Sequence, residues 1–211
     1  MTSRLRLRRI RLPGALALLG LVGPLGPTCA QASALYTIDP HTGRIEFTVS
    51  HLGLFHSHGE FSRFDSKLTI DSQHPERTAI NVVIHIASLT MAWENAADLL
   101  RSAAFFDAAH YPDARFTSTA VVPVSANHYI VKGNLEVRGV TRPIELDADL
   151  VERHLDTQTG TEVGNFVVQG HLQRSAFGMT ADSDFISDRV DLRISAHIQI
   201  VAPRPYVRAM T

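Results

Sequence analysis

The stretch that decides the fold is VDLRISAHIQI, residues 190–200, in which apolar and polar side chains alternate without a break. The apolar set is Val190, Leu192, Ile194, Ala196, Ile198 and Ile200. Successive side chains of a β-strand point to opposite faces of the sheet, so this period of two predicts a strand with one buried and one solvated face. We expect Ile194 and Ile198 to face the interior, and Arg193 and His197 to face water.

The same period recurs along the chain. Ile45, Phe47 and Val49 share one face of RIEFTVS, residues 44–50. In AINVVIHIAS, residues 79–88, the shared face belongs to Ile80, Val82, Ile84 and Ile86. Less regular strands are expected at 35–39, 59–70, 114–123, 128–138, 142–152 and 164–175. Polar turn sequences such as DSQHPER, residues 71–77, separate them, so neighbouring strands are expected to be antiparallel.

One segment departs from this pattern. LLRSAAFFDAAHYPDARFTST, residues 99–119, begins with Leu100 and Ala103 at helical spacing, and they continue an apolar face that starts at Trp93. Phe105 and Phe106 follow, and a Tyr-Pro pair ends the helical pattern. Antiparallel strands of this kind predict an all-β fold, either a sandwich or an up-and-down barrel. The long strands favour the barrel, with the short helix across its mouth.

Residues 1–32 predict a signal peptide that is cleaved on export. A start with five arginines precedes the apolar run LPGALALLGLVGPLG, residues 12–26, and the small residues of AQA, 30–32. We expect cleavage after Ala32, with Ala30 and Ala34 as alternatives, and a periplasmic protein. The alternatives for this segment are an uncleaved N-terminal membrane anchor and a lipoprotein signal with a lipid on Cys29. Residues 33–202 would then form one barrel domain, and 203–211 a C-terminal tail.

Composition excludes several classes of function. Loss of the five arginines leaves 15 of the 20 basic residues against 21 acidic ones, a net charge near −6. A mildly acidic chain without a basic aromatic patch is not built to bind nucleic acid. The single cysteine, Cys29, leaves with the signal, so the exported domain has no disulfide, no thiolate catalysis and no cysteine-based zinc site.

Motifs for catalysis and metal binding are weak. His51, His56 and His58 form the tightest histidine group, and two of them could share a metal, but no acidic ligand accompanies them. TADSDFISD, residues 180–188, lacks the glycine and the glutamate of a calcium loop. No serine lies in a GxSxG context. We therefore expect no catalytic residue, no metal and no cofactor.

Apolar side chains of the inward faces and of the helical segment are the candidate ligand contacts. A mostly apolar interior with few polar groups is what an elongated lipid requires. The candidates are Phe47, Val49, Phe55, Phe61, Ile84, Ile86, Trp93, Leu100, Phe105, Phe106, Phe116 and Phe177. Ordinary packing in a filled core is the alternative role for most of them.

Four blocks of the sequence resemble the YceI-like polyisoprenoid-binding proteins of bacteria. They are YTIDPHTGRIEFTVSHLGLFHSHGEF at 36–61, LLRSAAFFDAAHYPDARFTST at 99–119, GNLEVRGVTRPIEL at 133–146 and LQRSAFGMT at 172–180. Their order and their spread along nearly the whole exported chain make the resemblance specific. The chain departs from the family's Asp-x-His-Leu-Arg-Ser, because Ala97 and Leu99 stand in place of the Asp and the His. The interior should be more apolar there.

The resemblance implies an eight-stranded antiparallel barrel of lipocalin type with an apolar tunnel. Its ligand would be a polyisoprenoid or another long-chain amphiphile, such as a fatty amide. The implied function is that of an exported, non-catalytic carrier, a monomer or homodimer, with peripheral delivery from or to a membrane. Two alternatives stay open, an enzyme acting on the same lipid and a structural or stress-response protein whose barrel is filled by its own side chains.

Overall fold

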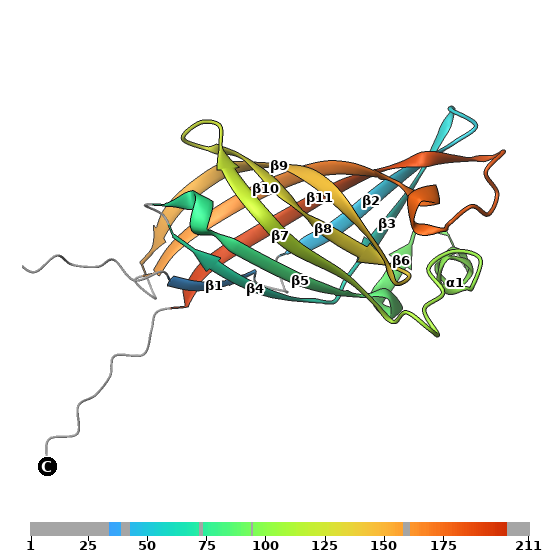
Figure 1. Cartoon of the computed structure of the whole chain (residues 1–211), viewed down its shortest axis with the longest axis horizontal. Coiled ribbons are helices and arrows are strands. Elements are labelled where there is room, and N and C mark those ends of the chain that lie inside the picture. Colours follow the sequence, from blue (N-terminus) through green and yellow to red (C-terminus); the bar gives the residue numbers. More distant parts are fainter. Residues whose placement is uncertain (1–33, 39–42, 72–73, 94, 158–160, 202–211) are drawn as a thin grey trace, which may run out of the picture. The chain divides into compact units, whose positions relative to one another are not determined.

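The computed structural model describes residues 34–38, 43–71, 74–93, 95–157 and 161–201 (Figure 1). The chain divides into two compact units, 1–31 and 32–211, and every described residue belongs to the second. The predicted signal peptide at 1–32 and the predicted tail at 203–211 both lie outside the described residues.

The described residues form a mostly β structure with one α-helix, as the sequence predicts. The strands are β1 (Ala34–Ile38), β2 (Arg44–His51), β3 (Phe55–Phe61), β4 (Phe64–Ile70), β5 (Ala79–His85), β6 (Leu89–Met91), β7 (Asp113–Pro123), β8 (His128–Val137), β9 (Val140–Asp156), β10 (Thr161–Gln173) and β11 (Ile186–Val201). The helix is α1 (Ala96–Arg101), and the 3₁₀ helices are η1 (Pro75–Arg77), η2 (Ile86–Ser88) and η3 (Arg174–Phe177).

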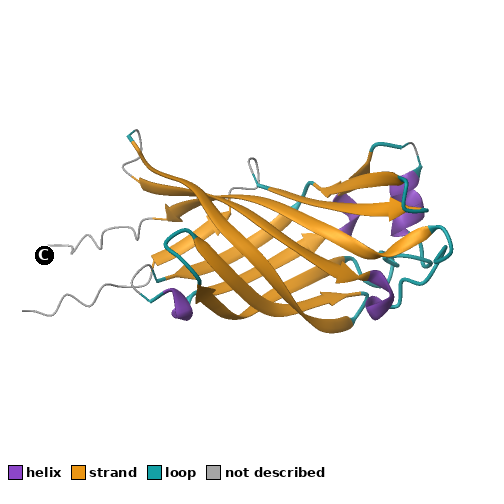
Figure 2. Ribbon diagram, turned by 90° about the horizontal axis from the view of Figure 1, so that it is seen from above, coloured by secondary structure: helices purple, strands orange, loops and turns teal. Residues whose placement is uncertain are grey.

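All strands belong to one curled antiparallel sheet (Figure 2). Their order is β1-β4-β5-β7-β8-β9-β10-β11-β2-β3-β6, and β1 also pairs with β11. The length of β11 allows this arrangement, because the half from Ile186 to Ser195 pairs with β2 while Ile198–Val201 pairs with β1. The sheet therefore curls back on itself and has an inner and an outer face.

The predicted number of eight strands is wrong, since the sheet has eleven. One reason is that the strand expected at 59–70 is broken into β3 and β4, which pair with different neighbours. Phe61 and Phe64, on either side of the break, are both buried. Residues three apart face opposite sides of a continuous strand, so only a break at Ser62 and Arg63 lets both rings reach the interior.

The strand expected at 79–88 is broken as well. β5 ends at His85, and η2 separates it from β6. The Ser88 side chain links the β3–β4 break to the end of β5. Its hydroxyl accepts a hydrogen bond from the Arg63 N–H at 3.1 Å and donates to the His85 carbonyl at 2.6 Å. Ile86 therefore leaves the face of β5 and packs into the core, where it is fully buried.

The predicted faces of β11 are confirmed for the aliphatic side chains. Ile198 is buried, Ile194 faces the interior, and Arg193, which precedes Ile194, is exposed. His197 is the exception, since it is half-buried instead of facing open water. Its Nδ1 lies 2.5 Å from Oδ1 of Asn165 on β10, so the neighbouring strand covers part of the ring.

The helix is shorter than the apolar pattern suggested. Trp93 lies before α1, and Ala103 and Ala104 lie in the turns that follow it. Ser102 has left the helical conformation, with ψ at 169°. In Figure 1, α1 lies beside β6 at one end of the curled sheet. No helix among the described residues has the length and apolar character that crossing a membrane demands.

Two glycines make room for phenylalanine rings on the inner face. A Cβ on Gly59 would stand 2.3 Å from Cζ of Phe47, and a Cβ on Gly133 would stand 2.4 Å from Cζ of Phe116. These separations are far below van der Waals contact, so any larger residue would displace the rings. Each ring thus occupies space that a side chain on the neighbouring strand would otherwise fill.

Candidate ligand-binding site

The curled sheet surrounds a cavity of about 430 Å³. Its lining includes Ile70 and Pro75 at the end that carries η1, and Trp93 and Leu99 at the end that carries α1. The cavity therefore extends along the inside of the sheet from one end toward the other. Its volume falls within the roughly 300–1,000 Å³ that is usual for small-molecule pockets.

The wall of the cavity is almost entirely apolar. Inner-face residues of β2, β5, β7, β8, β9, β10 and β11 contribute aliphatic and aromatic side chains. Among the described residues, the polar or charged side chains of the lining are His51, Ser57, Asp71, Thr78, Tyr129, Arg153 and Arg174. A cavity of this kind favours a ligand that is apolar over most of its length.

Nine of the twelve predicted ligand contacts line this cavity. They are Phe47, Val49, Phe61, Ile84, Trp93, Leu100, Phe105, Phe106 and Phe116. Rings from separate parts of the chain meet here: the centroids of Phe47 and Phe61 are 5.7 Å apart, and Phe106 meets Phe61 edge-on at 5.7 Å. The aromatic pair that follows α1 is thus part of the cavity wall, as the sequence predicts.

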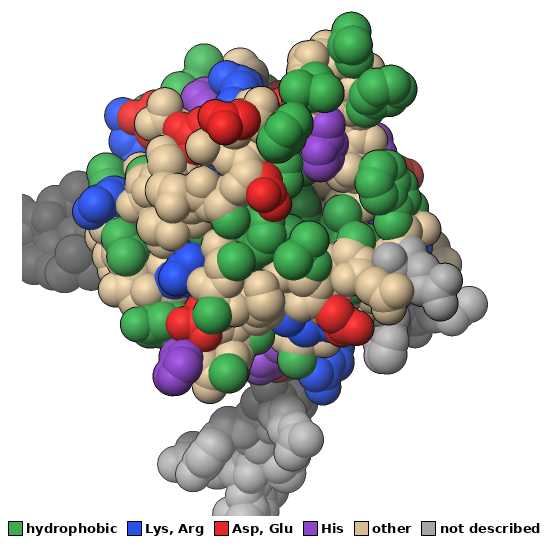
Figure 3. Space-filling view, turned by 90° about the vertical axis from the view of Figure 1, so that its right-hand side faces the viewer, with side chains coloured by type: hydrophobic (Ala, Val, Ile, Leu, Met, Phe, Trp, Pro, Cys, Tyr) green, Lys and Arg blue, Asp and Glu red, His purple; other side chains and the backbone are tan. Residues whose placement is uncertain are grey.

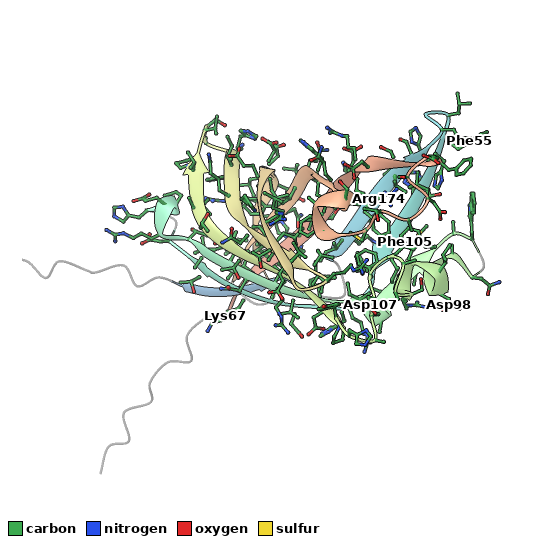
Figure 4. All side chains as sticks on the ribbon, turned by 45° about the vertical axis from the view of Figure 1, so that its right-hand side comes forward. Phe55, Lys67, Asp98, Phe105, Asp107 and Arg174 are labelled. Atoms are coloured by element: carbon green, nitrogen blue, oxygen red, sulfur yellow. The ribbon has the colours of Figure 1, made fainter. Side chains whose placement is uncertain are left out.

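The other three predicted contacts lie elsewhere, because each stands at the end of an element. Phe55 begins β3 at the tip of the β2–β3 hairpin, where its side chain is 67% exposed (Figure 4). Ile86 in η2 and Phe177 in η3 are each 1% exposed and pack in the core outside the cavity. Strand alternation does not extend into these turns, so it could not place them.

Sequence reasoning missed much of the wall that β8, β9 and β10 contribute. These lining residues are Tyr129, Val131, Leu135, Val137, Ile144, Leu146, Ala148, Phe166, Val168 and Leu172. The period of two was present in these strands and would have found most of them, for example Leu146 and Ala148.

Leu99 lines the cavity at the α1 end, at the position where the resemblance implies a histidine. Ala97, which replaces the family's aspartate, packs against the hydrophobic core. The side chains at these two positions carry no hydrogen-bonding group, so this part of the interior is apolar.

Arg174 is the most deeply buried charge among the described residues, with 5% of its surface exposed. Its guanidinium donates to four carbonyls: Nε to Ser187 at 3.0 Å, Nη2 to Ile186 at 3.0 Å, and Nη1 to Met179 and Ala181 at 2.9 and 2.7 Å. A planar guanidinium suits this task because its five donors have fixed directions. Arg174 thereby fastens the segment between η3 and β11 to the cavity wall (Figure 4).

Two further arginines fasten other segments at the same end. Nη1 of Arg138 donates to the carbonyls of Phe105 and Gly178, at 2.7 and 3.2 Å. Nη2 of Arg101 donates to the Leu89 carbonyl at 2.5 Å. The β8–β9 turn, the segment after α1, and η3 are thus joined around the α1 end of the cavity, which holds the Phe105 backbone in place.

The three histidines of the predicted group do not face one another. His56 and His58 lie on the outer face, where Nδ1 of each pairs with a hydroxyl of β2, Ser50 at 3.0 Å and Thr48 at 2.9 Å. His51 lines the cavity instead and stacks on Trp93, with ring centroids 6.4 Å apart. Its Nε2 is buried without a hydrogen-bond partner. Within the described ranges, no three histidine, cysteine, aspartate or glutamate residues are placed to hold a metal ion.

Comparisons with known proteins agree with this architecture. The profile of the YceI-like domain matches residues 36–198. A UPF0312 protein of Yersinia enterocolitica is 36% identical over 182 residues, which cover 84% of this chain and 94% of the relative.

Two solved structures share the fold. Burkholderia cenocepacia BcnA superposes with a TM-score of 0.68 at 20% identity, over 76% of this chain and 98% of that protein. A polyisoprenoid binding domain from Saccharophagus degradans, implicated in plant cell wall breakdown, superposes with a TM-score of 0.58 at 14% identity. That match covers 80% of this chain and 99% of the domain. At these identities the two structures show a common fold.

Proposed function

The chain belongs to the YceI-like domain family, and on that premise we propose that it is a non-catalytic binding protein that carries or sequesters a long-chain amphiphile. The observation that carries this proposal is the apolar cavity of about 430 Å³ inside the sheet. The name of the Saccharophagus domain, a polyisoprenoid binding domain, supports a prenyl chain as one class of ligand. A fatty amide or a fatty acid would fit the same apolar cavity.

The energetics favour such a ligand. Burial of about twenty methylene equivalents contributes well over 10 kcal/mol, at roughly 0.8 kcal/mol each, before the costs of association are subtracted. No charged anchor is required for binding of this strength. The guanidinium of Arg174 uses most of its donors on four backbone carbonyls, so its main role is to hold the cavity wall.

The two alternatives are less well supported by the geometry. An enzyme needs a titratable group beside its substrate, and among the described residues the titratable side chains of this mostly apolar lining are few: His51, Asp71, Tyr129, Arg153 and Arg174. A structural protein with a filled barrel would leave no space inside the sheet. The proposed ligand occupies a space that such a protein would lack.

We place this activity in the periplasm, after export directed by the arginine-rich start and the AQA sequence at 30–32. The protein would exchange its ligand peripherally, from or to a membrane, as a monomer or homodimer. The expected N-terminus near Ser33 is checked by the intact mass of the protein isolated from the periplasm. A retained N-terminus, or a lipid on Cys29, would refute this assignment.

The binding proposal is tested with delipidated protein. A ligand that binds only the folded state raises stability by about 2.7 kcal/mol at a hundredfold excess over its Kd. We expect delipidated protein to melt at a lower temperature and to recover when a prenyl alcohol or a fatty amide is added. If neither compound moves the melting temperature, the carrier proposal fails.

A pair of matched variants shows whether the ligand enters the cavity. Ala148→Phe and Ala196→Phe add rings to the inner wall and fill part of the space, because both alanines line it. Ala79→Phe adds the same ring to an exposed position of β5. We expect the two inner variants to fold and to lose the ligand-dependent rise in melting temperature, whereas Ala79→Phe keeps it.

A further inference from the structure

Six large apolar side chains are exposed at the α1 end of the sheet. They are Leu52, Leu54, Phe55, Trp93, Leu99 and Phe185, each between 53% and 76% exposed. We call them the apolar rim. They come from the β2–β3 hairpin, the β6–α1 segment and the loop before β11, and Figure 3 shows apolar side chains gathered on this side of the molecule.

Specific contacts join these segments around the opening of the cavity. The Leu52 N–H donates to the Phe185 carbonyl at 3.0 Å, which ties the hairpin to the loop before β11. Trp93 stacks on His51 at the base of the same hairpin. Trp93 and Leu99 also line the cavity, so the rim is continuous with its wall.

Folding does not account for the apolar character of the rim. Leu52 and Gly53 both have left-handed backbone conformations, with φ at 51° and 69°, and the Leu54 N–H closes the turn on the His51 carbonyl at 3.0 Å. Asparagine or glycine fits the first of these positions better than leucine, whose Cβ is strained there. Leu52 is also 62% exposed, so neither its conformation nor its burial stabilises the folded state.

We propose that the rim is the surface by which the protein docks on a zwitterionic lipid bilayer, with these side chains inserted among the headgroups. This proposal rests on the proposed function and names the surface that serves it. An amphiphile could then pass between the bilayer and the cavity beside Trp93 and Leu99 without crossing water. Tryptophan, phenylalanine and leucine are the side chains that favour the membrane interface.

The shape and charge of this end select the bilayer over other partners. Phe55 and its hairpin project from the sheet (Figure 4), and separate projecting tips suit a surface that deforms around them better than a rigid, complementary protein surface. Charges of both signs stand beside the rim: Asp98 pairs with Arg101 at 2.6 Å, and the exposed Asp184 precedes Phe185. Insertion of apolar side chains therefore dominates, and a strongly anionic surface is disfavoured.

Trp93 is the only tryptophan of the chain, so its fluorescence reports on the rim directly. The experiment mixes the full exported protein with phosphatidylcholine vesicles that contain a brominated phosphatidylcholine. We expect the emission to shift to shorter wavelength and to be quenched by bromine, at low and at high salt alike. Flotation of the vesicles in the same samples separates docking from uptake of a single lipid by the cavity.

Leu52→Asn is the decisive variant, because asparagine suits the left-handed position and the fold should be kept or stabilised. We expect its vesicle binding to fall about tenfold or more, since one inserted leucine is lost. Leu155→Asn is the matched control, because Leu155 lies on β9 outside the rim and is 61% exposed. It should bind vesicles as the unsubstituted protein does.

Three outcomes would overturn the proposal: no flotation with vesicles, equal losses for Leu52→Asn and Leu155→Asn, or self-association through the rim. The last would appear in sedimentation without vesicles, as a dimer that Leu52→Asn dissociates. The melting-temperature test keeps the two proposals apart. If Leu52→Asn still responds to a prenyl alcohol, the cavity function holds even where docking fails.

Discussion

Arg174 shows how one residue can hold the α1 end of the cavity together. Its guanidinium is buried and donates to carbonyls on both sides of the loop that precedes β11. A buried cation is costly unless its donors are paired, and here four backbone oxygens pair them. The four hydrogen bonds also hold the loop, so the buried charge and the loop stabilise each other.

Arg174→Lys should therefore be strongly destabilising although it keeps the charge. A lysine ammonium has three donors at one point and cannot reach carbonyls that a planar fork reaches in different directions. We expect the free energy of unfolding to fall by about 2–4 kcal/mol, measured by urea denaturation. Arg193→Ser, at an exposed position of β11, should change it little. Equal effects of the two substitutions would contradict the structural role of Arg174.

His85 connects three strands on the outer face of the sheet. Its Nδ1 lies 2.9 Å from a carboxylate oxygen of Asp113 on β7, and its Nε2 lies 2.9 Å from one of Asp65 on β4. The hydrogen bond to Asp113, followed by that to Asp65, raises the pKa of His85 above its usual 6.5. The folded state therefore favours the protonated imidazole.

The stabilisation from His85 should depend on pH with a defined sign. Because the pKa is raised in the folded state, the contribution is complete below the unfolded pKa of about 6.5 and is lost as the pH rises through the folded pKa. His85→Gln should lower the urea midpoint more at about pH 5.5 than at about pH 8.5. A difference from the unsubstituted protein that is the same at both pH values would contradict this assignment.

At the scale of the element, alternation along the strands is the most predictive property of the sequence. It places Phe47 and Val49 of β2, and Ile194 and Ile198 of β11, on the inner face, and all four line the cavity. The rule fails where a strand ends or breaks. The break between β3 and β4 has no glycine or proline, and Ser88, a residue 25 positions away from Arg63, is what holds it. Such a contact cannot be read from local sequence.

Strand faces also give a direct test. Ile194→Asp places a carboxylate in the cavity wall, which is almost entirely apolar and offers it few possible partners. We expect a loss of about 2–4 kcal/mol in the free energy of unfolding, unless the carboxyl stays protonated. Arg193→Ser, one residue away on the opposite face, serves as the control. Similar urea midpoints for both variants would mean that the register of β11 is wrong.

At the scale of the whole folded unit, the sequence predicts which side chains face inward but not whether they fill the space. That depends on the sum of side-chain volumes from every strand, including small residues such as Ala148 and Ala196 on the wall. It also depends on Gly59 and Gly133, which make room for two phenylalanine rings. The existence of an apolar interior could be predicted, whereas its unfilled volume had to come from the structure.

The central claim is that this interior holds a long-chain amphiphile, and one measurement tests it most directly. The protein is purified from its native host without detergent, extracted with organic solvent, and the extract is analysed by mass spectrometry beside that of the Ala148→Phe, Ala196→Phe double variant. We predict a prenyl or fatty-chain compound, near one per protein, that the double variant lacks. An extract free of lipid, or the same lipid in equal amount from the double variant, would contradict the account.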